Sequence, residues 1–193
     1  MSELKKYKMF IDGEWVDSES KKTFQTLNPE NNEPWAEVPE ASEKDVDKAV
    51  KAAQKAFEGT WPSLFPKERA KYLKAIAEQL RKNAELLGKI ETIDTGKLFK
   101  ETKTQANYIA EYYDYYAGLA DKVEGTVLPI DKPDMQVITT RVPIGVVAAI
   151  IPWNSQMLLT AVKLAPALAM GNTVVIKSSE LAPATLFEFG KLI

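Results

Sequence analysis

The sequence contains no cysteine and no histidine among its 193 residues. Without cysteine, these residues can form no disulfide and can supply neither a thiolate nucleophile nor thiolate ligands for a metal. Without histidine, they offer no imidazole that could act as a base near neutral pH. Ser-His-Asp and Cys-His chemistry are therefore excluded within the chain. Any catalysis needs carboxylates, lysines or tyrosines, or residues from elsewhere.

Charge and hydropathy exclude two further classes of protein. The net charge of −2 provides no basic field that would favour nucleic acid or an anionic membrane. No apolar run approaches the roughly 20 residues needed to span a bilayer. The start, MSELKKYKMF, lacks the apolar stretch of a signal peptide. We therefore expect a cytoplasmic protein without nucleic-acid or membrane partners, and its 45% hydrophobic residues are enough for a core.

The first part of the chain has the signals of a β-hairpin followed by helices. An Asp-Gly pair at 12–13 separates two short apolar runs, as in a tight hairpin turn. Ser42 is placed to cap a helix whose apolar residues recur at helical spacing until Gly59. Pro66 suits the first turn of a second helix, and Gly96 ends the helical pattern that follows it. A third helical stripe runs from there to about residue 120.

The next two segments each have a different periodicity. Residues 137–141 alternate with a period of two, and the surrounding prolines and charges predict an exposed ribbon or an arm that pairs with another chain. The last fifty residues contain the aliphatic runs GVVAAII and NTVVIK, which are typical of strands buried on both faces. The helix between them should be kinked at Pro166 and end at Gly171. Strand, helix, strand and helix in this order predict a parallel βαβ unit and an α/β fold.

Polar residues follow both aliphatic runs at the point where each strand is expected to end. The first run is followed by Pro-Trp-Asn at 152–154, and the second ends in Lys-Ser-Ser-Glu at 177–180. In open parallel sheets, ligands bind beyond the carboxyl ends of the strands. If the two strands are neighbours, both segments lie on one rim. The positive end of the intervening helix also faces that rim.

The Asn154 side chain offers two N–H donors without a charge. Aimed at a carbonyl oxygen, it could stabilise the negative charge that develops on nucleophilic attack, which is worth roughly 3–4 kcal/mol of barrier. The alternative is a helix N-cap, a common position for asparagine and the one that the local pattern favours. Trp153 beside it is either a core residue or a wall for a cofactor.

The second strand end also has two interpretations. Lys177 leaves the strand where a nucleotide phosphate or ribose could lie, and Glu180 could accept hydrogen bonds from ribose hydroxyls. The alternative, favoured by the local pattern, is a solvated lysine followed by a helix-capping Ser-Glu pair. The Gly-x-Gly-x-x-Gly turn is absent from both strand ends. These residues alone therefore do not indicate an ordinary Rossmann dinucleotide site.

Several segments resemble the aldehyde dehydrogenase superfamily. The strongest agreement lies in RVPIGVVAAIIPWN, KLAPALAMGNTVVIK and SSE, with weaker agreement in FIDGEWV, TLNPENNEP and ETIDTGK. Pro-Trp-Asn joined to APALAMGNTVV is far more specific than a lone glycine motif. The resemblance implies part of an NAD(P)-dependent oxidoreductase that converts an aldehyde to a carboxylate.

The resemblance also implies an architecture. A β-hairpin and a helix-rich part (residues 1–123) would precede an oligomerisation ribbon (124–141). The first βαβα of an open, Rossmann-like NAD(P)-binding domain (142–193) would follow. The parent protein is expected to be a homodimer or homotetramer joined through the ribbon, with a small aldehyde as its substrate.

Family roles fall on individual positions of this sequence. Asn154 matches the amide of the family's oxyanion hole, over the thiohemiacetal. The tryptophan and the backbone before it would lie along NAD(P), and the lysine and glutamate after the second strand would hold the adenosine ribose. The implied cofactor contacts are Ile151, Pro152, Trp153, Asn154, Lys177, Ser179 and Glu180. Glu180 favours NAD over NADP because it repels a 2′-phosphate.

Two further sites follow from the resemblance alone. Lys163 matches a lysine that lies near the active site in some members. Thr26, Leu27 and Asp94 match a monovalent-cation site that is also found in some members.

Two departures and one absence limit the resemblance. Ser178 stands where family members usually have proline, and PWNSQ replaces the commoner Pro-Trp-Asn-Phe-Pro. The family's general-base glutamate and catalytic cysteine are expected beyond Ile193. Aldehyde oxidation through a covalent intermediate needs a thiolate, so we expect the isolated chain to be inactive and, with open strand edges, only marginally stable.

Two other functions compete with this interpretation. A related reductase could act on an acyl-phosphate or acyl-CoA through the same scaffold. The chain could instead be a truncated, non-catalytic module that joins full-length subunits through its ribbon.

Overall fold

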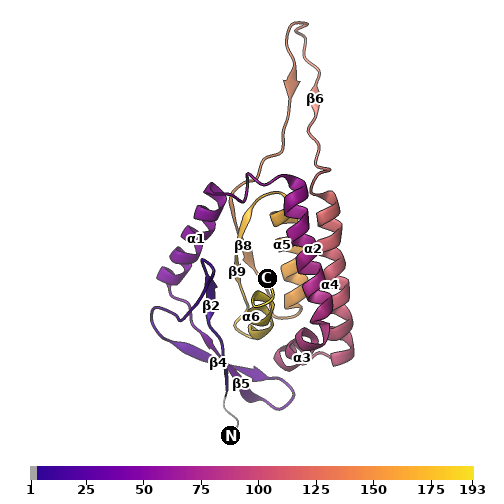
Figure 1. Cartoon of the computed structure of the whole chain (residues 1–193). Coiled ribbons are helices and arrows are strands. Elements are labelled where there is room, and N and C mark those ends of the chain that lie inside the picture. Colours follow the sequence, from indigo (N-terminus) through magenta and orange to yellow (C-terminus); the bar gives the residue numbers. More distant parts are fainter. Residues whose placement is uncertain (1–3) are drawn as a thin grey trace.

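The computed structural model describes residues 4–193 and has a mixed α/β architecture (Figure 1). The helices are α1 (Glu43–Glu58), α2 (Pro66–Lys82), α3 (Ala84–Thr95), α4 (Phe99–Leu119), α5 (Gln156–Ala169) and α6 (Ala184–Gly190). The strands are β1 (Lys5–Lys6), β2 (Met9–Ile11), β3 (Glu14–Val16), β4 (Thr23–Asn28), β5 (Glu33–Pro39), β6 (Val127–Leu128), β7 (Val137–Ile138), β8 (Val146–Ile150) and β9 (Thr173–Lys177). None of these helices is long and apolar enough to cross a membrane.

The N-terminal strands form a hairpin and a small three-stranded sheet. β2 pairs antiparallel with β3 across Asp12 and Gly13, whose φ angles of 53° and 82° are those of a tight hairpin turn. This confirms the hairpin that the Asp-Gly pair predicts. The second sheet has the order β1-β5-β4, with β1 parallel and β4 antiparallel to β5.

Helix α1 begins where the capping signal predicts. The Ser42 hydroxyl donates to the Asp45 carboxylate over 2.8 Å, and the Asp45 backbone N–H donates back to that hydroxyl over 3.3 Å. The carboxylate also accepts hydrogen bonds from Ser18 and from the Glu19 backbone, which ties the helix to the loop before β4. Burial alone would raise the pKa of Asp45, but these hydrogen bonds outweigh it and hold the pKa at about 2.

Helices α2, α3, α4 and α5 form the main core, which we call the helical body. Their apolar stripes meet in one cluster, as the helical spacing predicts. Its fully buried members include Leu73, Leu80, Leu87, Ile109, Tyr113 and Ala161. α2 starts at Pro66, and α3 ends at Gly96 in the left-handed conformation with φ 75°. Both boundaries agree with the sequence.

Strands β8 and β9 are adjacent and parallel, and α5 connects them. Their register runs from Val146 opposite Thr173 to Ile150 opposite Lys177. At the other end of the pair, the side-chain oxygen of Asn172 accepts backbone hydrogen bonds from residues 144 and 145 over 2.8 and 3.1 Å. The asparagine thus fixes where β8 begins relative to β9. α5 runs from Gln156 to Ala169 as one helix, with Pro166 inside it.

The expectation that both aliphatic strands are buried on two faces is wrong for β8. Ala149 is 1% exposed, but Ile150 on the opposite face is 69% exposed. Successive strand residues point to opposite faces, and α1 and α5 flank the strand pair on either side (Figure 1). The two helices leave the carboxyl end of β8 uncovered within residues 4–193, so apolar content overestimates its burial.

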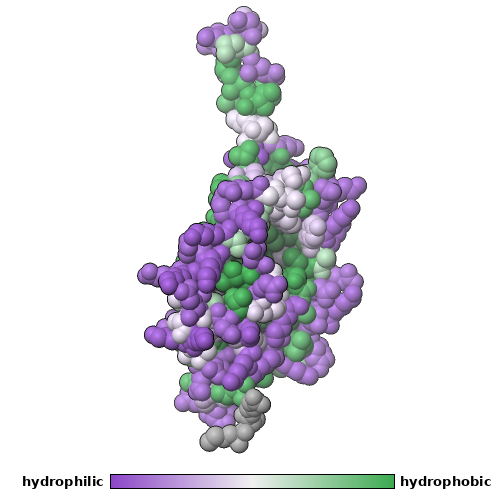
Figure 2. Space-filling view, turned by 60° about the vertical axis from the view of Figure 1, so that its left-hand side comes forward, coloured by the Kyte–Doolittle hydropathy of each residue, from purple (hydrophilic) through white to green (hydrophobic). Residues whose placement is uncertain are grey.

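A long, thin ribbon projects from one end of the helical body (Figure 1). Its strands β6 and β7 pair antiparallel over two residues each, so the regular part is shorter than the alternating pattern predicts. Thr126 and Thr139 link the two sides through their hydroxyls, 2.8 Å apart. Apolar side chains run along the ribbon in Figure 2, and Val127 and Ile138 are 62% and 60% exposed. The predicted exposure of the ribbon is confirmed.

The beginning and the end of the described chain pack against each other. Tyr7 stacks on Phe187 with ring centroids 5.2 Å apart. Lys5 forms an ion pair with Glu188, with Nζ 2.6 Å from the carboxylate oxygen. These contacts join the β1-β5-β4 sheet to α6.

Candidate functional site

The two polar strand ends lie on one rim, because β8 and β9 are neighbours in parallel register. Ile150 is opposite Lys177, and the backbone N–H of Ile151 donates to the Lys177 carbonyl over 2.9 Å. The Pro-Trp-Asn segment therefore leaves the sheet beside the Lys-Ser-Ser-Glu segment. This is the arrangement that the sequence predicts for a ligand site at the carboxyl ends of the strands.

Asn154 is exposed and does not cap a helix. The N-cap position of α5 belongs to Ser155, and the Asn154 side chain makes no hydrogen bond within residues 4–193. Trp153 is 53% exposed, so it is not a core residue in this chain. Within residues 4–193, neither structural alternative describes these positions. An uncharged amide and an indole stand free at the rim, available to a ligand.

Lys177 and Glu180 form an exposed ion pair at the second strand end. Their charged atoms are 2.8 Å apart, and their side chains are 62% and 67% exposed. The hydrogen bond and the charge of Lys177 lower the pKa of the Glu180 carboxyl. Exposed pairs of this kind contribute little stability, so a ligand can replace the contact at small cost.

The Ser-Glu pair at 179–180 does not cap α6. That helix begins at Ala184 with Pro183 in the N-cap position. Ser179 is 6% exposed, and its hydroxyl accepts a hydrogen bond from the Leu181 backbone over 3.2 Å. The capping alternative is excluded, and the Ser179 side chain instead stabilises the turn that presents Glu180.

Lys163 is half-buried within α5. Its ammonium donates to the Leu159 carbonyl of the same helix over 3.3 Å. The residue lies about two and a half turns beyond Asn154, and the structure does not bring the two side chains into contact within the described residues.

The structure brings Thr26 and Asp94 together beneath β4. The Thr26 hydroxyl donates to one Asp94 oxygen over 3.2 Å. The other oxygen accepts from the backbones of Ala184 and Thr185 over 2.7 and 3.3 Å. Burial raises the pKa of Asp94 to about 6, against the lowering effect of these hydrogen bonds. Asp94 thus joins β4 to the start of α6.

A hollow of about 330 Å³ opens above this contact. It is lined by Gln25, Thr26, Leu27, Pro29, Asn32, Glu180 and Leu181. The Leu27 side chain is apolar, so only its backbone offers polar atoms there. No group of three or more acidic, histidine or cysteine residues that could hold a metal occurs in the part of the chain that the structure describes.

A polar cluster beneath the Pro-Trp-Asn segment was missed by the sequence analysis. The Lys97 ammonium donates to the Ser155 hydroxyl over 2.5 Å and lies 3.8 Å from a carboxylate oxygen of Glu91. Glu91 is 2% exposed, and burial raises its pKa to about 7, although the charge of Lys97 opposes this. No local pattern in the sequence indicates this cluster, because Lys97 and Ser155 are far apart in the chain.

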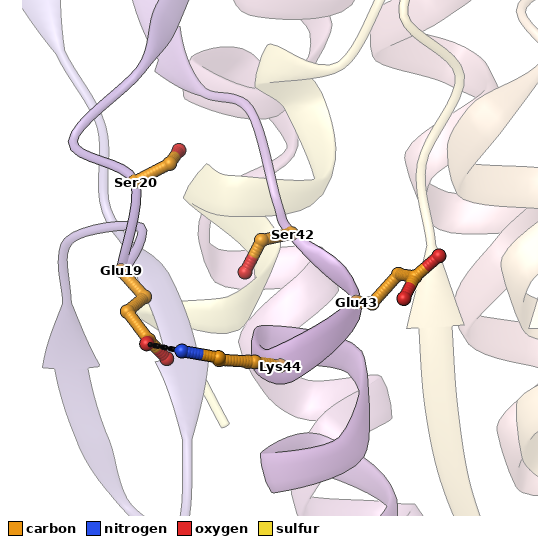
Figure 3. Close-up of a pocket in the computed structure, with 5 residues that line it drawn as sticks. All are labelled: Glu19, Ser20, Ser42, Glu43 and Lys44. Carbon is orange, nitrogen blue, oxygen red and sulfur yellow. Dashed lines mark hydrogen bonds and ion pairs between the residues drawn. The ribbon is translucent and has the colours of Figure 1, made fainter.

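A second hollow of about 400 Å³ lies at the start of α1, and its residues are shown in Figure 3. It is lined by Glu19, Ser20, Ser42, Glu43 and Lys44. An ion pair of 2.7 Å between Lys44 and Glu19 crosses it. None of these residues belongs to the rim, and the capping contacts of α1 account for their arrangement.

Comparisons with known proteins identify the family. The model of the aldehyde dehydrogenase family matches residues 15–193. The chain belongs to this family. A betaine aldehyde dehydrogenase of Staphylococcus aureus, solved in complex with NAD+, superimposes with a TM-score of 0.92 at 39% identity. The match covers 96% of this chain and 37% of that one.

Curated members of the aldehyde dehydrogenase family are similar over nearly the whole chain. The (Z)-2-((N-methylformamido)methylene)-5-hydroxybutyrolactone dehydrogenase of Acinetobacter baylyi is 50% identical over 191 residues, which cover 98% of this chain and 39% of that protein. The betaine aldehyde dehydrogenase of Bacillus subtilis is 44% identical over 186 residues, 96% of this chain and 38% of that protein. The chain therefore spans about two fifths of the length of these relatives.

Proposed function

We propose that this chain supplies the oxyanion-stabilising amide and part of the NAD(P) site of an aldehyde dehydrogenase that oxidises an aldehyde to a carboxylate. The observation that carries the proposal is the parallel register of β8 and β9. It sets the free amide of Asn154 on the same rim as the exposed Lys177–Glu180 pair. The family membership of residues 15–193 supports the same activity.

The rim residues fit a dinucleotide. Trp153 offers an exposed apolar face, and Lys177 and Glu180 offer a cation and a carboxylate for phosphate and ribose groups. Ile151 is 2% exposed, so its contribution comes mainly through the backbone, whereas Pro152 is exposed before the tryptophan. Ser179 acts by holding the turn at Glu180. NAD is favoured over NADP because the Glu180 carboxylate repels a 2′-phosphate.

Asn154 would act on the substrate oxygen. When a nucleophile attacks the aldehyde carbonyl, negative charge develops on that oxygen, and an N–H donor already in place stabilises it. The Asn154 amide makes no competing hydrogen bond within residues 4–193. It can therefore donate to the substrate oxygen without first breaking another hydrogen bond. NAD(P), when bound, supplies the acceptor for the hydride that leaves the same carbon.

The nucleophile is not among these 193 residues, because they include no cysteine. We therefore predict that the isolated chain has no dehydrogenase activity. An oxyanion hole stabilises an anion only when another group generates it.

The remaining assignments follow the family pattern. Residues 1–123 would form the N-terminal β-hairpin and the helical part of the cofactor domain. Residues 124–141 would form the oligomerisation ribbon, and 142–193 the first βαβα of the NAD(P)-binding domain. Lys163 would lie near the active site. Thr26, Leu27 and Asp94 would hold a monovalent cation, for which the buried carboxylate of Asp94 is a suitable oxygen ligand.

A chimera tests the catalytic proposal. Residues of this chain replace the matching 38% of the Bacillus subtilis betaine aldehyde dehydrogenase, and NADH formation from betaine aldehyde is measured. We expect Asn154→Ala to lower kcat by about 100- to 1,000-fold, as for other oxyanion-hole donors. Asn107→Ala, on the exposed face of α4, is the matched control. Equal kcat values for the two variants would show that Asn154 is not the donor.

The exposed ribbon favours a second function for the isolated chain, namely a non-catalytic module that joins subunits. Its apolar residues are available to another chain, with Val127 and Ile138 each at least 60% exposed. The test is sedimentation of the 193-residue chain together with its melting temperature in NAD+. Stable self-association with no effect of NAD+ on melting supports the module, and a rise in melting temperature supports the cofactor site.

A further inference from the structure

The Pro-Trp-Asn segment is held from outside its own helix. Ser155 occupies the N-cap position of α5, but its side chain makes no capping hydrogen bond. Its hydroxyl is instead engaged by the ammonium of Lys97, 2.5 Å away. Lys97 follows α3 in the chain, so this one contact connects α3 to the residue directly after Asn154.

Few other polar contacts could orient this turn. Gln156, the first residue of α5, is fully buried, and neither polar atom of its side chain has a hydrogen-bond partner among the described residues. On the other side, the Ile151 backbone is fixed to β9. Between these two points, Lys97 is the polar side chain of residues 4–193 that hydrogen-bonds to the segment.

A buried acid lies beside Lys97. Glu91 lies one side of its ammonium, 3.8 Å away, and is 2% exposed. The Lys97 side chain is 27% exposed, much less than most lysines of the chain that form ion pairs. Because the Lys97 side chain is already partly buried, it loses less freedom on bonding to Ser155 than an exposed lysine would, so the contact can hold a defined geometry.

We propose that Lys97 is a positioning residue that acts through Ser155 to set the direction of the Asn154 amide. The inference rests on the proposed role of Asn154 in the oxyanion hole. It concerns the hydroxyl of Ser155. Phenylalanine is the commoner residue at this position in the family, and its side chain could accept no hydrogen bond from Lys97.

Nuclear magnetic resonance of the 193-residue chain tests the link directly. Asparagine is labelled with nitrogen-15, and the side-chain amide of Asn154 is assigned by its loss in Asn154→Ala. We expect Lys97→Met and Ser155→Ala to move this resonance to similar positions, and the double variant to add nothing further. Ser155→Thr, which keeps the hydroxyl, should restore the wild-type position. Lys100→Met, an exposed lysine in the first turn of α4, is the matched control.

The same variants in the chimera give a kinetic readout. We expect Lys97→Met to lower kcat by about 10- to 100-fold, the scale of a misplaced catalytic group, with KM little changed. If Lys97→Met does not fold, Ser155→Ala is used for the test, because it removes one hydroxyl from a half-buried position. The inference would be overturned if neither Lys97→Met nor Ser155→Ala changed the Asn154 resonance or kcat.

The two proposals fail in distinguishable ways. If Asn154→Ala abolishes turnover but Lys97→Met and Ser155→Ala leave the Asn154 amide unchanged, the positioning inference is wrong and the oxyanion role stands. If Asn154→Ala leaves turnover intact, the oxyanion role is wrong, and with it the catalytic meaning of Lys97.

Discussion

The helical body and the ribbon use the same kinds of apolar residue in opposite ways. In the body, Leu80 and Tyr113 are at most 1% exposed. In the ribbon, Leu128 and Ile138 are 45% and 60% exposed. The body buries its apolar surface within the chain, whereas the apolar surface of the ribbon remains exposed. Apolar content alone therefore does not distinguish a core from a surface that binds another chain.

Architecture explains the difference. Each helix of the body has an apolar stripe, and four such helices can enclose their stripes between them. A two-stranded ribbon has no third layer to cover either of its faces, and such ribbons are marginal on their own in water. Three matched pairs of substitutions, one member in each region, test this comparison.

The largest effect is expected for loss of leucine volume. Leu80→Ala in the body should lower the free energy of unfolding by about 3 kcal/mol, because it removes buried methyl groups and leaves a cavity. Leu128→Ala in the ribbon should change it by less than about 0.5 kcal/mol. Urea unfolding followed by circular dichroism measures both. Similar losses at the two positions would mean that the ribbon is packed in solution.

A smaller effect is expected from the buried acid. Burial raises the pKa of Glu91 to about 7, so folding favours its protonated form. The stabilisation from the protonated carboxyl is fully present at pH 4 and is lost as the pH rises through 7. The free energy of unfolding should fall by about 2 to 3 kcal/mol over this range. Asp94, with a pKa raised to about 6, acts in the same direction.

Glu91→Gln should therefore be more stable than the wild type at pH 8, with a smaller difference at pH 5. Glu124→Gln, in the exposed ribbon, is the matched control for the change in charge. Urea unfolding at both pH values provides the comparison. A Glu91→Gln variant that loses stability at pH 8 would show that the ion pair with Lys97 outweighs the cost of burial.

The smallest effect is expected from hydroxyl groups. The Thr102 hydroxyl, buried in α4, donates to the Gly88 carbonyl over 2.8 Å and lies 2.9 Å from that of Thr92. Thr102→Val should cost about 1 kcal/mol because it leaves these partners unsatisfied. Thr139→Val removes the hydroxyl contact across the ribbon and should cost less than about 0.5 kcal/mol. Thermal unfolding of both variants checks the order, and a larger loss in the ribbon would reverse it.

Local signals in the sequence predicted most of the fold. The Asp-Gly pair gave the turn of the hairpin, and Ser42 gave the start of α1, because both depend on residues within one turn of each other. The parallel pairing of β8 with β9 was also predictable, since a helix between two aliphatic runs allows few other arrangements. The exposure of Ile150 could not be predicted from the sequence, because it depends on which layers cover the sheet.

The candidate site was predictable only in part. The sequence placed Asn154 and Lys177 on one rim, because both follow strands of the same parallel pair. It could not resolve whether Asn154 capped α5, since the cap lies one residue later, at Ser155. The contact between Lys97 and Ser155 was missed because it joins residues far apart in the chain, and only the packing of α3 near the start of α5 reveals it.

The contact between the two ends of the described chain bears on how the protein is made. The aromatic ring of Tyr7 stacks on Phe187, and the ammonium of Lys5 pairs with Glu188 near the other end of the described chain. On a ribosome, β1 and its neighbours leave the exit tunnel long before those partners are translated. The contacts of the N-terminal sheet with α6 therefore cannot form until late in translation, and until then chaperones have access to the ring of Tyr7 on the side that Phe187 later covers.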